Sequence, residues 1–145
     1  MKNKTLTGIL VSTLLNTNSL ATECDFKTDC NVKAFVELVK FHGVKNEDNR
    51  YNLTVQVSGD RFYVEYFDNS PIGKVGEEDE LRISDNGVSF YDSNLDGFLP
   101  RDRNYVSNDK VFGLGDINKH PEKRIEAETT YRKNILRISN HLLKK

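Results

Sequence analysis

The side chains of this chain best suited to binding chemistry lie in one short segment. Asp92, Asn94 and Asp96 occupy alternate positions, and Gly97 follows the last of them. Ca²⁺ is a hard cation that binds about six to eight oxygens at roughly 2.3–2.6 Å, and a short loop must turn sharply to surround it. The spacing therefore predicts a calcium loop, in which these three side chains and the backbone carbonyl of Phe98 are ligands.

The segment resembles the D-x-N-x-D-G loop shared by EF-hand and dockerin proteins, and the resemblance covers residues 92–99. It implies a bound calcium ion. In both families an acidic residue stands at the twelfth loop position, whereas this chain has Arg103 there and Asp102 one residue earlier. We expect Asp102, or an acid from the run at 77–80, to complete the ligand shell of a structural site of modest affinity. An Asx turn, whose side chains hydrogen-bond their own backbone, is the alternative without an ion.

Two predicted hairpins must position this loop. Apolar residues alternate with polar ones over 51–57 and again over 62–66, and a turn sequence separates the two runs. A second pair of runs, 81–83 and 88–90, flanks an Asn-Gly dipeptide, which favours a tight turn. The candidate calcium loop follows the second hairpin directly, so a strand and not a helix leads into it.

The two hairpins end alike. Each ends in an aromatic pair and an aspartate, which is Asp68 in the first and Asp92 in the second, 24 residues later. This agreement predicts strand-loop repeats, with chance as the alternative because aspartate is common in loops. The predicted copies span residues 62–75, 86–99 and, more weakly, 110–119. In the first copy Ile72 stands where the fifth ligand belongs, so we expect no ion there.

Helices are predicted on both sides of the hairpins. Residues 31–42 carry apolar side chains at helical spacing, with Asn31 placed to cap the first turn and Gly43 to end the helix, although the valines leave a strand as a competitor. Pro121 fits the first turn of a long C-terminal helix. Its apolar stripe comprises Ile125, Tyr131, Ile135, Ile138 and Leu142. The predicted fold class is α+β, with an antiparallel sheet of β-hairpins flanked by an N-terminal helix and a long C-terminal helix.

The aromatic residues of the hairpins cannot all face the same way. Strand alternation puts Phe62 and Tyr66 on one face of the sheet and Tyr63 and Phe67 on the other. Burial under the two helices is the expected outcome, and exposure of either set would mark a binding surface.

The first 21 residues resemble a secretory signal, with lysines before an apolar stretch and the small-x-small sequence Ser19-Leu20-Ala21. We expect cleavage after Ala21, a single α+β domain over 22–145, a secreted or periplasmic location, and no stable membrane insertion after cleavage. An uncleaved membrane anchor is the alternative, but the apolar stretch is shorter than the ~20 residues that span a bilayer. Cys24 and Cys30 would form a disulfide in an oxidising compartment, and free thiols in the cytosol.

The charge balance argues against a nucleic-acid partner. The formal net charge is −1, and loss of Lys2 and Lys4 with the signal lowers it to −3. The predicted function is non-enzymatic: an exported calcium-stabilised binding or structural module with a protein or glycan ligand. A small secreted metal-assisted hydrolase is an alternative, and it requires His120, Asp96 and an acid from 77–80 to converge in a cleft. A secreted inhibitor or effector that binds another protein is a third, and it requires an exposed aromatic patch.

Overall fold

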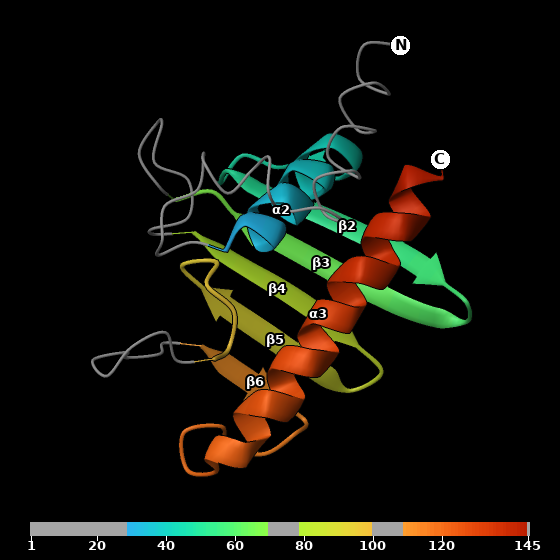
Figure 1. The fold of residues 1–145 in the computed structure, drawn as a ribbon. Helices are drawn as coiled ribbons and strands as arrows, with labels where there is room; N and C mark the ends of the chain where they lie inside the picture. The colour runs from blue at the N-terminus through green and yellow to red at the C-terminus, as the bar shows by residue number, and fades with distance from the viewer. Residues whose placement is uncertain (1–28, 70–78, 100–108, 145) are drawn as a thin grey trace.

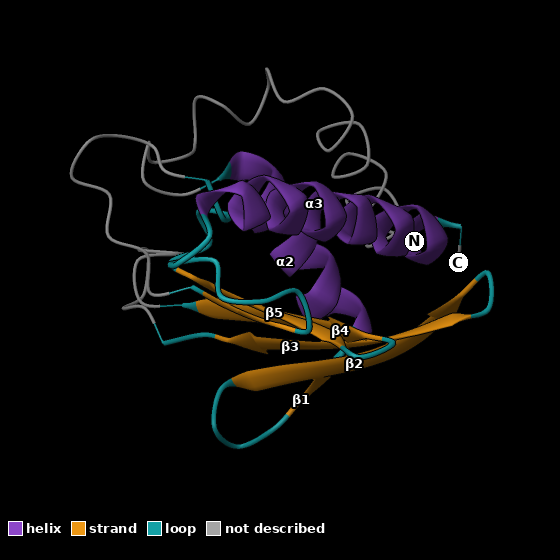
Figure 2. Ribbon diagram, turned by 90° about the horizontal axis from the view of Figure 1, so that it is seen from below, coloured by secondary structure: helices purple, strands orange, loops and turns teal. Residues whose placement is uncertain are grey.

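The protein folds into a single antiparallel sheet with two helices on one of its faces. The computed structural model describes residues 29–69, 79–99 and 109–144. Six strands follow one another across the sheet in chain order, and the ribbon views show both helices on the same side of it (Figure 1, Figure 2). The predicted α+β class is confirmed.

Both predicted hairpins are present. The strands are β1 (Val44–Lys45), β2 (Arg50–Val57), β3 (Asp60–Phe67), β4 (Glu80–Asp85), β5 (Val88–Ser93) and β6 (Lys110–Phe112). The β2–β3 turn contains Gly59 and the β4–β5 turn contains Gly87, with φ of 89° and 95°, angles that glycine adopts without steric cost. The edge strand β1 was not predicted, because two residues are too few to display an alternating pattern. The other edge strand, β6, lies at the start of the weaker third copy predicted at 110–119.

Helix α2 (Cys30–His42) confirms the predicted N-terminal helix and corrects its cap. Asp29, not Asn31, is the N-cap: its carboxylate accepts the backbone N–H groups of Asn31 and Val32 at 2.9 and 3.2 Å. The described part of the chain has no free cysteine. Cys24 lies outside the described residues, as does the predicted signal at 1–21, so the disulfide and the signal stay predictions.

Helix α3 (Pro121–Leu143) crosses the sheet diagonally in Figure 1. Four members of its predicted stripe are buried, but Ile125 is 63% exposed and the prediction for it is wrong. Ile125 stands two positions before the buried Ala127, and at 3.6 residues per turn this puts its side chain on nearly the opposite side of α3, away from the sheet. Ala127, which the sequence pattern missed, is the first fully buried residue of the helix.

The core fills the space between the helices and one face of the sheet. Its largest fully buried side chains are Tyr66, Tyr131, Phe35, Phe62, Phe90 and Phe98. The other face of the sheet carries no helix from the described ranges (Figure 2). None of the helices described is both long and apolar enough to span a membrane.

Candidate metal centre

Asp92 lies near the end of β5 with its side chain turned into the core. It alternates with buried Phe90 and is itself fully buried. Its Oδ1 accepts the backbone N–H groups of Asp96 and Gly97, each at 3.1 Å. Its Oδ2 accepts the hydroxyl of Tyr131 at 2.6 Å. The carboxylate therefore binds its own loop through Oδ1 and helix α3 through Oδ2.

The loop after β5 needs an unusual backbone. Asn94, Leu95 and Gly97 have φ of 69°, 56° and 80°, which lie in the left-handed region. A Cβ on Gly97 would lie 2.6 Å from Nη2 of Arg132 and 2.9 Å from Oε2 of Glu128. Glycine is therefore required there both for its backbone angle and for the close approach of α3.

A closed chain of polar contacts holds this loop against both helices. The backbone N–H of Phe98 donates to Glu128 at 2.6 Å, and Glu128 accepts Nε of Arg132 at 2.6 Å. Arg132 pairs with Asp29 at 2.8 Å, and the Asp29 N–H donates to the Leu95 carbonyl at 2.9 Å. The loop thus contacts the N-terminus of α2 and the middle of α3, which fixes its position relative to the core.

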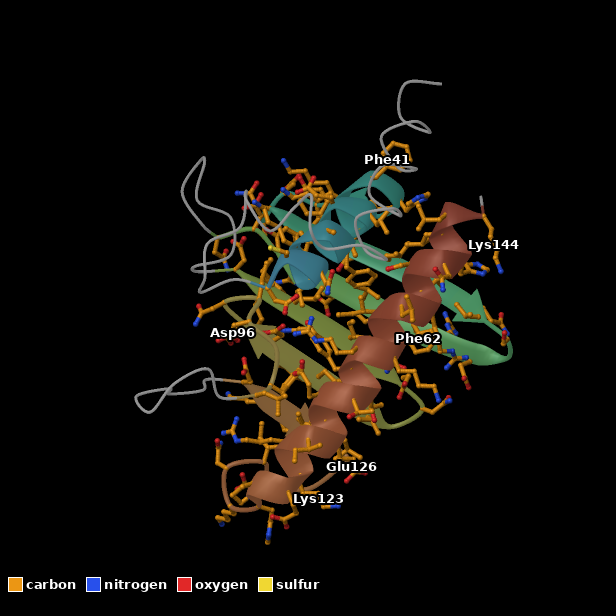
Figure 3. All side chains as sticks on the ribbon, viewed as in Figure 1. Phe41, Phe62, Asp96, Lys123, Glu126 and Lys144 are labelled. Atoms are coloured by element: carbon orange, nitrogen blue, oxygen red, sulfur yellow. The ribbon has the colours of Figure 1, made fainter. Side chains whose placement is uncertain are left out.

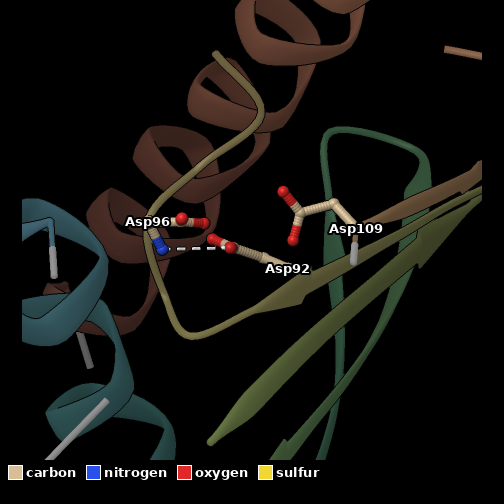
Figure 4. Close-up of side chains that lie close together, drawn as sticks. All are labelled: Asp92, Asp96 and Asp109. Atoms are coloured by element: carbon tan, nitrogen blue, oxygen red, sulfur yellow. Dashed lines mark hydrogen bonds between the residues drawn. The ribbon is translucent and has the colours of Figure 1, made fainter. Parts of the chain in front are cut away.

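Asp109 completes a group of three carboxylates with Asp92 and Asp96. It stands directly before β6, is 2% exposed, and accepts the backbone N–H of Ser93 at 2.7 Å. One oxygen from each carboxylate lies within 4.8 Å of the other two. Figure 4 shows the three side chains pointing toward one another from the end of β5, its loop and the residue before β6. Such a group suits a metal ion that takes oxygen ligands.

The three charges oppose one another in a buried place. Burial, then the charge of Asp109, and to a smaller extent that of Asp96, raise the pKa of Asp92 well above its usual range, against the opposing hydrogen bonds from Tyr131 and Gly97. Burial and the charge of Asp92 likewise raise the pKa of Tyr131. A cation between the carboxylates would offset this repulsion and favour the ionised form of each.

The structure brings together only some of the predicted ligands that it describes. It brings Asp92 and Asp96 together, whereas Asp102 lies outside the described residues. The Phe98 carbonyl accepts a hydrogen bond from Arg124 at 3.3 Å, and the backbone N–H of Asn94 donates to the carbonyl of Asp79 at 2.9 Å. Asp102, Asn94 and the carbonyl of Phe98 stay predicted ligands. Asp92 hydrogen-bonds the backbone of its own loop, as in the alternative without an ion, but it accepts from N–H groups four and five residues on and not from the one two residues on that defines an Asx turn.

Sequence reasoning missed Asp109, although a signal for it exists in the first hairpin. Asp79 stands directly before β4 as Asp109 stands before β6, and it accepts the Asn69 N–H at 2.9 Å as Asp109 accepts that of Ser93. Asn69 and Ser93 are equivalent positions of the predicted repeat. The loops that follow the two hairpins differ in length, and this hides the correspondence. Asp79 and Asp109 are 30 residues apart, whereas Asn69 and Ser93 are only 24 apart.

Of the residues proposed for hydrolysis, Asp96 belongs to the group of three aspartates, whereas His120 and Glu80 lie apart from it. His120 is exposed and contacts Glu122 at 3.5 Å at the start of α3. Glu80 pairs with Arg82 on the face of the sheet without helices. Neither belongs to the group of three aspartates, and Glu77 and Glu78 lie outside the described residues.

Comparison with known proteins adds no relative to this picture. No family model matches the chain, and neither a curated protein nor a solved structure matches it. The functional proposal therefore rests on the geometry of the chain itself.

Proposed function

We propose that Asp92, Asp96 and Asp109 bind Ca²⁺, and that the protein is an exported calcium-stabilised binding or structural module. The observation that carries the proposal is the convergence of three carboxylates, one of them fully buried, from three successive parts of the chain. Ligands on opposite sides of one calcium ion lie about 5 Å apart, since each bond is roughly 2.3–2.6 Å. Carboxylate oxygens within 4.8 Å of one another therefore fit one coordination shell.

The hydrogen bonds of Asp92 are compatible with an ion. A carboxylate has about four lone-pair positions. The Asp96 N–H donates to Oδ1, the Gly97 N–H lies 3.1 Å from both oxygens, and the Tyr131 hydroxyl donates to Oδ2. These three donors make four contacts, two on each oxygen, so a cation on Oδ2 would replace the Gly97 contact there and leave the Gly97 N–H bound to Oδ1. The same hydrogen bonds hold the carboxylate in a fixed orientation, which lowers the entropy cost of binding.

A structural role follows from where the ion would lie. It would join the end of β5, its loop and the residue before β6, beneath Tyr131 of α3. An ion that binds only the folded chain raises the free energy of unfolding by mass action, by roughly 2.7 kcal/mol when free calcium is about 100 times its Kd. The ion would thus stabilise the positions of the loop and of strands β5 and β6 relative to helix α3.

Calorimetric titration and thermal melting test the proposal together. We expect Ca²⁺ to bind one site per chain and to raise the melting temperature of chelator-treated protein. Asp96→Asn should abolish both effects, because it removes a ligand charge and leaves the Asp92 hydrogen bonds in place. Asp48→Asn is the matched control, since Asp48 lies in the exposed loop between β1 and β2. A flat titration with an unchanged melt would leave only the loop hydrogen bonds of Asp92 and would refute the calcium site.

The inhibitor or effector alternative has one observation in its favour. Tyr63 and Phe112, on the sheet face without helices, are 42% and 54% exposed. Exposed aromatic side chains on one face are typical of a surface that contacts another molecule. They support the binding role within the proposed module, and they do not depend on the ion.

A further inference from the structure

A continuous row of arginines and aromatic rings crosses the sheet face without helices. We name it the arginine–aromatic ladder, and it contains one residue from each of the strands β2 to β6: Arg50, Phe67, Arg82, Tyr91 and Phe112. The guanidinium carbons of Arg50 and Arg82 each lie 4.4 Å from the centre of the Phe67 ring. Arg82 also lies 4.9 Å from the Tyr91 ring, whose centre is 5.3 Å from that of Phe112.

Strand register assembles this ladder. Arg50 stands directly opposite Phe67, and Arg82 directly opposite Tyr91. Phe112 is the diagonal neighbour of Tyr91, whose direct partner is Lys110. Because the residues next to the ladder positions along each strand face the helices, the ladder itself faces away from them.

The ladder presents positive groups to its surroundings. Each guanidinium lies beside a ring on a neighbouring strand, so the ring faces point along the sheet and the ring edges point outward. Ring edges are electropositive, and the rims of the guanidinium groups carry N–H donors. The stacking also holds the arginine side chains in place before any partner arrives.

The charge of the whole face agrees with this local geometry. Its outward-facing ionisable residues in the described strands are four basic and two acidic ones: Arg50, Arg61, Arg82, Lys110, Glu65 and Glu80. The face is therefore basic within a chain whose net charge is −1. Lys110 is exposed and forms no ion pair with any other described residue. It lines a groove of about 610 Å³ together with Arg82, Tyr91, Phe112 and Asn118, and the acidic residues Glu80 and Asp109 also line this groove.

We propose that the arginine–aromatic ladder is the docking surface for an acidic segment of another protein. Carboxylates of that segment would accept from Arg82 and Lys110 in the groove, while apolar groups pack on Phe112 and Tyr91. Arginine and aromatic residues dominate the central, most energetic part of protein interfaces. The inference deepens the binding role proposed above and does not depend on the calcium ion.

Two observations favour a protein over a nucleic acid or a sulfated glycan. Glu65 contacts Arg50 at 3.7 Å and Glu80 pairs with Arg82, so the same face carries negative charges that repel a uniform polyanion. The ring faces beside the guanidinium groups are already covered, which leaves Phe67 little surface for base stacking. A protein segment, with its mixture of acids and apolar groups, matches both features.

Fluorescence anisotropy with a labelled glutamate–tyrosine copolymer, which carries both carboxylates and apolar rings, tests the inference on the full chain at low salt. We expect binding, and a loss of roughly tenfold in affinity for Arg82→Glu and for Lys110→Glu, the size that separates central contacts from peripheral ones. Lys133→Glu makes the same charge change on the exposed side of α3 and is the matched control. It should retain the affinity of the natural chain.

Further variants guard against misfolding and nonspecific attraction. Lys110 is exposed and forms no ion pair within the described ranges, so Lys110→Glu tests the surface even if Arg82→Glu fails to fold. Arg82→Lys keeps the charge but loses the planar group that stacks between two rings, and it should also weaken binding. Asp96→Asn should bind the glutamate–tyrosine copolymer normally, which separates failure of the ladder from failure of the calcium site.

Three results would overturn the inference. The first is no binding, or equal loss in Lys133→Glu. The second is tighter binding of heparin or single-stranded oligothymidylate with the same sensitivity to Arg82→Glu, which would mark a general polyanion surface. The third is self-association by sedimentation that Arg82→Glu abolishes, without binding of the glutamate–tyrosine copolymer, which would make a second copy of this chain the occupant.

Discussion

The hydroxyl of Tyr131 in α3 donates a 2.6 Å hydrogen bond to Oδ2 of Asp92 in β5, and both side chains are fully buried. The two residues are 39 positions apart in the chain. This contact joins the long helix to the loop that carries the acidic group. It also orients the buried carboxylate on which the metal proposal depends.

Tyr131→Phe removes the donor and leaves a buried carboxylate oxygen without that hydrogen bond. We expect the free energy of unfolding to fall by about 1–3 kcal/mol, as for other buried groups that lose a partner. Urea denaturation measures the change. Tyr63→Phe is the control, because its hydroxyl makes an exposed contact of 3.4 Å with Asn52, and it should change stability little. Equal changes in the free energy of unfolding for the two variants would show that the hydrogen bond between Tyr131 and Asp92 does not stabilise the fold.

Gly97→Ala should destabilise the protein more than Gly59→Ala. Both glycines have left-handed φ angles, 80° and 89°, so each substitution carries a backbone cost of about 1–2 kcal/mol. Only at Gly97 would the new methyl group meet Arg132 and Glu128, whereas nothing lies within 4 Å of the same position at Gly59. Denaturant melts of both variants measure the difference in stability. Equal stability losses would mean that Arg132 and Glu128 of α3 can move away from the new methyl group without destabilising the fold.

The Asp29–Arg132 pair predicts a loss of stability in acid. Burial raises the pKa of Asp29, but the hydrogen bond and charge of Arg132 and two backbone N–H groups outweigh it, so the pKa lies below the ordinary 3.8. A lowered folded-state pKa means that the stabilisation is complete above the unfolded-state pKa and is lost as pH falls through the folded-state value. The loss should therefore begin near pH 4 to 5, about the ordinary aspartate pKa.

Asp29→Asn isolates this contribution, because asparagine is an equally good N-cap without the charge. The stability difference between the natural chain and Asp29→Asn should be largest near neutral pH and shrink as the pH falls below the ordinary aspartate pKa. Chemical denaturation at a series of pH values measures it. A difference that does not vary with pH would argue against the ion pair as its source.

Asp109→Asn should have effects of opposite sign with and without calcium. In calcium it removes a ligand charge, so the melting temperature should fall toward that of chelator-treated protein. In EDTA it removes the neighbour whose charge helps raise the pKa of Asp92, so stability should rise. Asparagine keeps the oxygen that accepts from Ser93. A fall under both conditions would show that the charge of Asp109 does not destabilise the calcium-free protein.

The sequence by itself determined the local structure around the candidate site. Alternation over short runs and a turn dipeptide placed β2 to β5, and apolar spacing placed α2 and α3, because these signals depend on neighbours within a few residues. The spacing of Asp92 and Asp96 beside Gly97 is equally local. It sufficed to predict where the carboxylates gather and which residue allows the loop to turn.

Only the tertiary structure decided which distant groups join Asp92 and Asp96. Asp109 reaches the acidic group because β6 pairs with β5, and Tyr131 reaches Asp92 because α3 packs across the sheet. The arginine–aromatic ladder likewise exists only once strand register places Arg82 beside Phe67 and Tyr91. Periodicity tells which face of its own element a side chain occupies, but the partner on another element is set by register and packing over the whole chain.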